Sequence, residues 1–119
     1  MNRTTHPIWR WILGAAAAYN LVVALPALFA AGASTDQRIV ALLVARFGLV
    51  YALVAREPAR LAPVLWAGIV GKAGIVALVL PDVLAGRAVP GTGAVLAGDA
   101  LFTLLFLLFL LGPRRLTGR

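Results

Sequence analysis

The stretch AGIVGKAGIVAL, residues 67–78, places one charged residue, Lys72, near the middle of a long apolar run. Three other apolar runs share this design, with one polar residue each: AAAAYNLVVAL (15–25) with Asn20, ALLVARFGLVY (41–51) with Arg46, and VLAGDALFTLL (95–105) with Asp99. The four polar residues are 26, 26 and 27 positions apart. A charge at bilayer depth is costly unless it is paired or hydrated, so we expect these side chains to face one another rather than lipid.

The composition indicates a membrane protein. Of the 119 residues, 62% are hydrophobic and only 13% are charged. A soluble domain of this length has too little interior to bury so much apolar surface, whereas a lipid bilayer accommodates it. The length fits a single domain, residues 1–119.

The runs predict four helices at approximately 8–31, 39–55, 63–82 and 93–112. About 20 apolar residues are needed to cross the hydrocarbon core, and these segments are close to or above that length. Short loops join them, which favours antiparallel neighbours. The predicted fold class is therefore all-α, a membrane-embedded antiparallel four-helix bundle.

Several residues indicate where the helices begin, end and meet. Asp36 is a candidate cap for the second helix, and Pro58 is expected to stop it. Pro81 and Asp82 are expected to end the third helix or to cap a brief re-entry. Small residues let helices approach closely, so we expect a neighbouring helix to pack closely along three regularly spaced glycines, Gly68, Gly71 and Gly74.

The start of the chain has some features of a secretory signal peptide. Arg3 and Arg10 are basic, and residues 31–33 (AGA) resemble a cleavage site. However, the apolar region is longer than the usual 7–15 residues and contains Asn20 and Pro26. We therefore expect this segment to be retained as a membrane helix.

The distribution of basic residues predicts the orientation. Two loop arginines, Arg38 and Arg87, lie on one side of the predicted membrane. Seven lie on the other: Arg3, Arg10, Arg56, Arg60, Arg114, Arg115 and Arg119. Cytoplasmic segments are enriched in Lys and Arg, so we expect both termini and the middle loop to be cytoplasmic.

Composition also argues against several function classes. The chain has no cysteine, which excludes disulfides, thiolate metal sites and a cysteine nucleophile. One histidine and four acidic residues argue against a zinc or di-iron centre, so we expect no metal and no cofactor. The net charge of +7 suggests nucleic acid at first, but the basic residues are dispersed, and we expect no such partner. No nucleophilic triad, carboxylate pair or phosphate loop is present, so we expect a non-enzymatic protein.

The four interior polar residues are the candidate site. By depth, Asn20, Arg46, Lys72 and Asp99 can meet in one layer near the bilayer midplane. A lysine stem of about 6 Å cannot cover the roughly 15 Å to the interface, and Arg46 has the same difficulty. We expect Arg46 to pair with Asp99, with Lys72 and Asn20 in the same layer. Two cations and one carboxylate leave an excess of +1, which requires a neutral Lys72, water or an anion.

Three interpretations of this site remain open. In the first interpretation, Arg46 and Asp99 form an interhelical ion pair that fixes the helix register, and Lys72 lines a hydrated crevice. In the second interpretation, the layer of four polar residues binds an anionic or carbonyl-bearing group, such as a quinone head or a lipid headgroup. In the third it is a proton or ion path, for which a single acid and no buried histidine provide few groups.

Neighbouring residues have less specific interpretations. Thr103 follows Asp99 by one helical turn, and its hydroxyl is expected to bond to the backbone. Tyr19 and Tyr51 are expected to be packed aromatics near the site. The phenylalanines Phe102, Phe106 and Phe109 are expected to face lipid or to pack.

Five short segments resemble small four-helix bacterial membrane proteins of the DoxX-like group: YN (19–20), RFG (46–48), AREPAR (55–60), GKAG (71–74) and GDALFTLLF (98–106). The resemblance covers nearly the whole chain. It implies a multi-pass protein of the bacterial inner membrane that is associated with quinone-linked redox complexes. Without any cysteine, thiol redox chemistry cannot be transferred to this chain.

The sequence thus predicts a small membrane protein that binds a quinone-like or lipid-like ligand or serves as a subunit of a membrane redox complex. Its partners would be the lipid bilayer, such a ligand, and a homo-oligomer or larger membrane complex. The alternative is a small transporter or an ion- or proton-conducting protein. At this length such a protein would need to oligomerise to enclose a path.

Overall fold

The computed structural model describes residues 6–112, and these form helices and turns without any strand. Four helices are long and apolar enough to cross a membrane, which indicates a multi-pass membrane protein. The long helices are α1 (Ile8–Leu28), α2 (Thr35–Arg56), α4 (Leu65–Leu84) and α5 (Thr92–Leu111). Two short helices, α3 (Pro58–Leu61) and the 3₁₀ turn η1 (Ala62–Val64), join α2 to α4.

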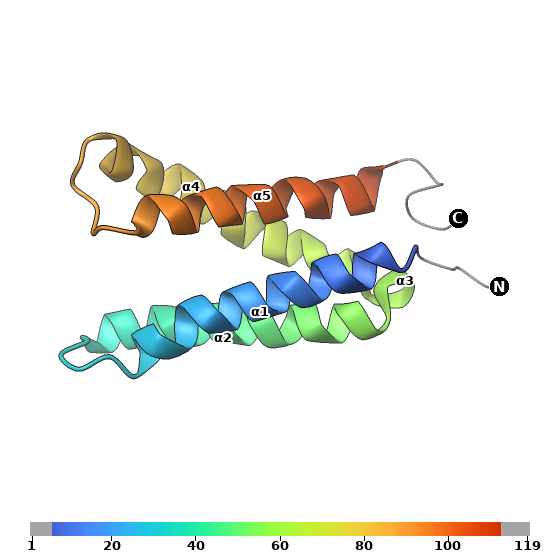
Figure 1. The fold of residues 1–119 in the computed structure, drawn as a ribbon, viewed down its shortest axis with the longest axis horizontal. Coiled ribbons are helices and arrows are strands. Elements are labelled where there is room, and N and C mark those ends of the chain that lie inside the picture. The colour runs from blue at the N-terminus through green and yellow to red at the C-terminus, as the bar shows by residue number, and fades with distance from the viewer. Residues whose placement is uncertain (1–5, 113–119) are drawn as a thin grey trace.

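The long helices form two hairpins, α1 with α2 and α4 with α5 (Figure 1). The loops at 29–34 and 85–91 lie at one end of the molecule, here called the loop end. The start of α1, the end of α5 and the α3 connection lie at the opposite end, here called the terminal end (Figure 1). Each hairpin packs far more extensively within itself than against the other hairpin. The arrangement is therefore two pairs of helices that meet over part of their length, rather than a uniform four-helix bundle.

A capping box fixes the start of α2. The Ser34 hydroxyl accepts a hydrogen bond from the Gln37 backbone N–H at 3.1 Å, and the Gln37 side chain accepts one from the Ser34 N–H at 2.8 Å. This reciprocal pair satisfies two N–H groups that have no partner within the helix. The expectation that Asp36 is the cap was wrong, and the helix begins at Thr35 rather than near residue 39.

Prolines act differently at the two connections. Pro58 opens the short helix α3, where Arg60 pairs with Glu57 at 2.7 Å. The hydrogen bond from Arg60 holds the pKa of the Glu57 carboxyl below its ordinary value. Pro81 was expected to end the third helix, yet α4 continues through it to Leu84. A proline so near a helix end removes one hydrogen bond without preventing the last few residues from staying helical.

Small residues bring α1 and α2 together. A Cβ added at Gly48 would lie 3.2 Å from the Ala17 carbonyl oxygen, so the two backbones nearly touch there. The close approach expected along Gly68, Gly71 and Gly74 holds only at Gly68, because nothing lies within 4 Å of a Cβ at the other two.

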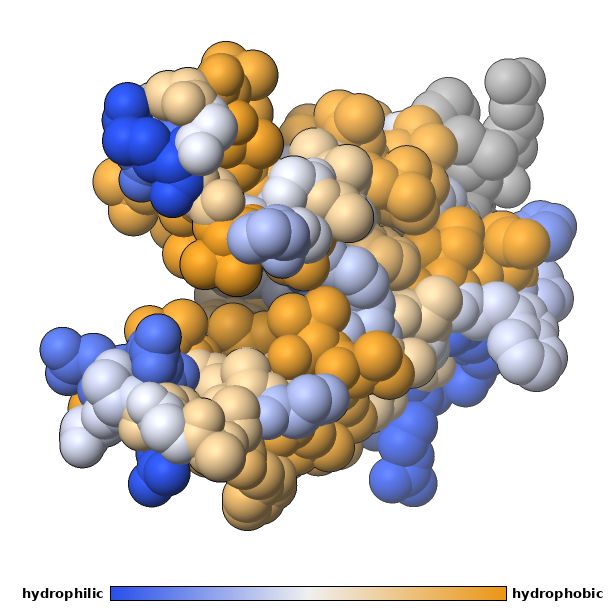
Figure 2. Space-filling view, turned by 60° about the vertical axis from the view of Figure 1, so that its left-hand side comes forward, coloured by the Kyte–Doolittle hydropathy of each residue, from blue (hydrophilic) through white to orange (hydrophobic). Residues whose placement is uncertain are grey.

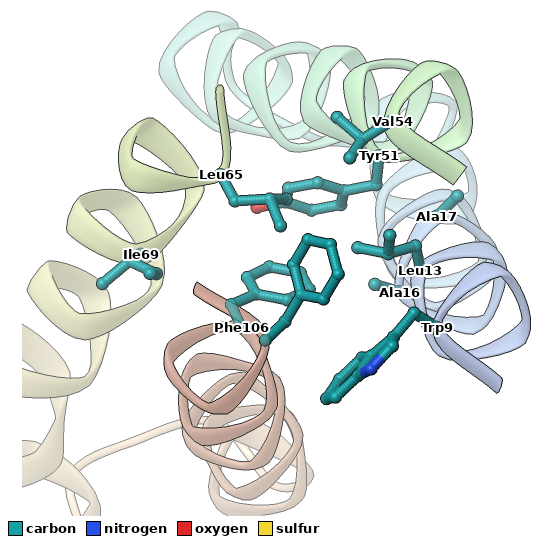
Figure 3. Packing of buried hydrophobic residues seen from close by; sticks show 10 residues of the cluster. Trp9, Leu13, Ala16, Ala17, Tyr51, Val54, Leu65, Ile69 and Phe106 are labelled. Atoms are coloured by element: carbon teal, nitrogen blue, oxygen red, sulfur yellow. The ribbon is translucent and has the colours of Figure 1, made fainter. Parts of the chain in front are cut away.

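The main cluster of buried apolar residues lies in the terminal half of the molecule, and a few small or single residues such as Ala24 and Leu96 are buried beyond it. Its buried residues come from all four long helices (Figure 3): Trp9, Leu13, Ala16, Ala17, Tyr51, Val54, Leu65, Ile69, Phe106 and Phe109. Phe106 and Phe109 thus pack inside the protein rather than facing lipid. On the α1, α4 and α5 helices, every core residue lies on the terminal side of the candidate polar residue. The core therefore ends where the polar residues begin.

Candidate functional site

Lys72 is the centre of the site. Its ammonium Nζ donates to Asp99 Oδ1 at 2.8 Å and to Asn20 Oδ1 at 2.9 Å. The side chains of Lys72 and Asp99 are only 6% and 13% exposed. Three of the four predicted residues, Asn20, Lys72 and Asp99, are therefore brought together, and we call them the polar layer.

Asn20 extends the polar layer to the fourth long helix. Its side-chain Nδ2 donates to the Val44 carbonyl of α2 at 3.0 Å, while its oxygen accepts from Lys72 of α4. Asp99 of α5 completes the layer through Lys72. One set of hydrogen bonds thus links all four long helices at a single level, directly beyond the apolar core.

Three aromatic rings surround the ammonium group. Lys72 Nζ lies 5.0 Å from the ring centroid of Tyr19, 5.5 Å from that of Tyr51 and 5.7 Å from that of Phe102. The negative face of an aromatic ring attracts a cation at such distances, and the attraction is stronger where water is excluded. The prediction that both tyrosines are packed aromatics near the site is confirmed, and the structure adds that their rings lie beside the lysine ammonium.

Both tyrosines rest against glycines of the opposite hairpin. A Cβ added at Gly98 would lie 2.5 Å from the Tyr19 hydroxyl oxygen, and one at Gly68 would lie 2.5 Å from that of Tyr51. The Tyr19 hydroxyl also donates to the Val95 carbonyl of α5. Gly68 is one helical turn before Lys72 and Gly98 directly precedes Asp99. The glycines therefore make room for the rings beside the charged pair.

The Thr103 hydroxyl donates to the Asp99 backbone carbonyl at 2.8 Å, as the sequence predicted. The hydroxyl therefore finds its hydrogen-bond acceptor within its own helix. The Asp99 carboxylate takes its hydrogen bond from Lys72.

Arg46 does not belong to the polar layer, so the predicted Arg46–Asp99 pair was wrong. Its side chain is exposed on α2, and its guanidinium carbon lies 5.9 Å from the ring of the adjacent Phe47. No carboxylate among residues 6–112 forms an ion pair with it. Without Arg46, one cation faces one carboxylate, and the expected excess of +1 disappears from the site.

A groove lies on the loop side of the polar layer, between α1 and α2. Its volume is about 710 Å³. Small and apolar residues line most of it, with two polar residues: Val23, Ala24, Ala27, Ala30, Ala31, Gly32, Ala33, Asp36, Gln37, Val40, Ala41 and Val44. All of these residues belong to the α1–α2 hairpin. Figure 2 shows, at the same end, a hollow between this hairpin and the other one, with hydrophobic surface on both sides.

The groove leads to the polar layer. Ala24 is one helical turn from Asn20, and Val44, whose carbonyl accepts the Asn20 amide, lines the groove itself. The groove therefore borders the polar layer at Asn20, whereas the Lys72 and Asp99 side chains are not part of its lining. Within the described residues, no cluster of His, Asp and Glu side chains is arranged to hold a metal ion.

The chain has no significant match among protein-family models, curated proteins or solved structures. Its function is therefore inferred from the chemistry of the site.

Proposed function

We propose that this chain is a multi-pass protein of the bacterial cytoplasmic membrane that binds a small amphipathic ligand, with the ligand head at the polar layer and its tail in the groove. The supporting observation is the buried hydrogen-bonded set of Lys72, Asn20 and Asp99, whose member Asn20 bonds to Val44 at the edge of a mostly apolar groove. Intramembrane ionisable residues that face the protein interior commonly mark binding sites.

The charges favour a neutral ligand head. Lys72 and Asp99 neutralise each other at 2.8 Å, so the site has no excess charge that would attract an anion. The lysine is a hydrogen-bond donor and the carboxylate an acceptor, so together they suit a head with carbonyl or hydroxyl groups. The rings of Tyr19, Tyr51 and Phe102 add flat apolar surfaces beside the ammonium. A quinone or quinol head has these properties, whereas a phosphate headgroup would need an additional cation.

The groove suits an apolar tail. Alanine and valine form most of its lining, and the only ionisable residue there is Asp36, next to the loop end. A chain of isoprenoid or acyl type would bury this surface and remove it from lipid or water. The resemblance to DoxX-like proteins points to the same ligand class, and membership of a redox complex would place such a ligand next to an electron-transfer partner.

The proposed orientation places the terminal end on the cytoplasmic side, because seven of the nine loop and terminal arginines would lie there. The groove would then open toward the outer leaflet. Reporter fusions made after Gly91 and after Leu111 should report opposite sides of the membrane. The same side for both would contradict this orientation.

Binding is tested with decyl-ubiquinone titrated into the purified protein in mild detergent, and quinones that copurify are identified by mass spectrometry. We expect saturable binding that Lys72→Met reduces at least about tenfold, which corresponds to one hydrogen bond to a charged group. Arg87→Met removes an exposed cation at the loop end and serves as the matched control. Equal binding by the wild type and Lys72→Met would contradict the proposal and favour a purely structural role.

A further inference from the structure

The outer face of α2 carries a regular stripe of residues. Its members are spaced alternately by three and four positions: Ile39, Leu42, Arg46, Leu49 and Leu53. The four apolar members are each at least half exposed, and Arg46 is exposed as well. This spacing aligns side chains along one helix face and is the spacing with which two helices pack side by side. Apolar exposure alone is expected of any lipid-facing helix, so Arg46 is the distinguishing feature.

Arg46 lies in the middle of the span. It is eleven residues after Thr35 and ten before Arg56, so it is about 15 Å from either end of the helix. The guanidinium remains charged in proteins, and its side chain is too short to reach a membrane interface from this depth. Within residues 6–112 its guanidinium lies over the ring of Phe47, which is a weak partner compared with a carboxylate. A lone arginine at this depth needs an anion beside it.

We propose that the α2 stripe is the binding surface for a transmembrane helix of another protein that presents an acidic side chain at the bilayer midplane. A carboxylate matches the planar guanidinium with two parallel hydrogen bonds, and both charges are then removed from lipid together. The apolar members of the stripe, two before Arg46 and two after it, would pack against the partner helix and exclude water from the arginine–carboxylate pair.

A second copy of this chain does not fit the surface. Three of the four acids, Asp36, Glu57 and Asp82, lie at or beyond helix ends, and Asp99 is buried against Lys72. A two-fold symmetric contact through the stripe would also place one Arg46 against the other. The partner must therefore supply a carboxylate that this chain does not expose.

The stripe and the groove lie on different sides of α2. At 3.6 residues per turn, the groove residues Val40 and Val44 lie on the side of α2 opposite to the stripe residues. A helix bound at the stripe would therefore leave the groove accessible. This inference is independent of the proposed ligand.

The test uses the full chain in lipid vesicles with synthetic leucine-rich transmembrane peptides that carry a central Glu, Gln or Lys. Association is measured by energy transfer between labelled protein and labelled peptide. We expect the wild type to bind the Glu peptide about tenfold more tightly than the Gln peptide. Arg46→Leu should lose this preference, and Arg46→Glu should prefer the Lys peptide instead. Arg46→Lys, which retains the charge, should keep a preference for Glu.

Two matched controls separate the stripe from general effects. Arg38→Leu removes a cation near the loop end of α2 and should leave the preference unchanged. Leu49→Ala should weaken binding of the Glu peptide, whereas Leu104→Ala, at an equally exposed site on α5, should not. Equal binding of Glu and Gln peptides by the wild type would overturn the proposal, as would a preference that persists in Arg46→Leu. Cross-linking of two copies of the Leu49→Cys variant through this cysteine would overturn it as well.

Discussion

At the scale of single residues, the Lys72–Asp99 pair dominates the interior of this protein. Both side chains are removed from solvent and lie 2.8 Å apart, and Asn20 supplies a second acceptor for the ammonium. Each charge depends on the other, because neither has another charged partner among the described residues. A buried pair of this kind need not raise stability compared with apolar residues, but a half-removed pair is strongly destabilising.

We therefore expect Asp99→Asn to lower the free energy of unfolding by about 3–5 kcal/mol, because Lys72 would keep a buried charge without its counterion. The double variant Lys72→Met, Asp99→Leu should recover most of this loss. Thermal unfolding in detergent, followed by circular dichroism, measures both effects.

Arg46→Leu is the control for this cycle, because Arg46 lies outside the polar layer. It should combine additively with Asp99→Asn. Strongly non-additive effects of the Arg46 and Asp99 substitutions on the free energy of unfolding, together with additive effects of the Lys72 and Asp99 substitutions, would contradict the Lys72–Asp99 pairing.

At the scale of helices, the apolar runs predicted which segments are helical, because a long apolar run has few other ways to satisfy its backbone in a membrane. The ends were harder to predict, since the Ser34–Gln37 capping box lies outside the apolar run it starts. The rotation of each helix was harder still. Arg46 has the same depth as Lys72, but Gly48 lies against Ala17 of α1 and Ala45 is buried, so the opposite side of α2, with Arg46, faces outward. Depth alone therefore predicted three members of the polar layer and misplaced the fourth.

Glycine positions show how the hairpins contact each other. Gly68→Ala and Gly98→Ala should each destabilise the protein by about 1–3 kcal/mol, because the new methyl group would overlap the ring of Tyr51 or Tyr19. Gly71→Ala and Gly74→Ala are the matched controls. Nothing lies within 4 Å of a methyl group added at either position. Both substitutions should therefore stabilise α4 by up to about 1 kcal/mol, since alanine is the better helix former.

Thermal unfolding in detergent distinguishes these four variants. Equal effects of Gly68→Ala and Gly71→Ala would contradict the close contact between Tyr51 and α4. Unchanged stability of Gly98→Ala would likewise contradict the close contact between Tyr19 and α5.

At the scale of the whole molecule, the two ends have different structures. The terminal half has a continuous core from all four long helices, whereas the loop half consists of two hairpins with a groove beside α1 and α2. The polar layer lies at the boundary between these halves. This asymmetry could not be read from the sequence, because each apolar run has the same general character on both sides of its polar residue, and hydropathy does not show which side chains meet. It depends on where tyrosines, glycines and alanines meet across helices.

The position of a ligand at the polar layer can be measured by photolabelling with two versions of a quinone probe. One version carries its photoreactive group on the ring, and the other carries it at the end of the tail. The labelled residues are located by mass spectrometry of the full-length protein in vesicles. The ring label should appear on residues around Asn20 and Lys72, and the tail label on the groove residues between Ala27 and Val40. Lys72→Met should abolish the ring label. Labels scattered over exposed faces such as Leu78 and Leu104, unchanged by Lys72→Met, would contradict a binding site at the polar layer.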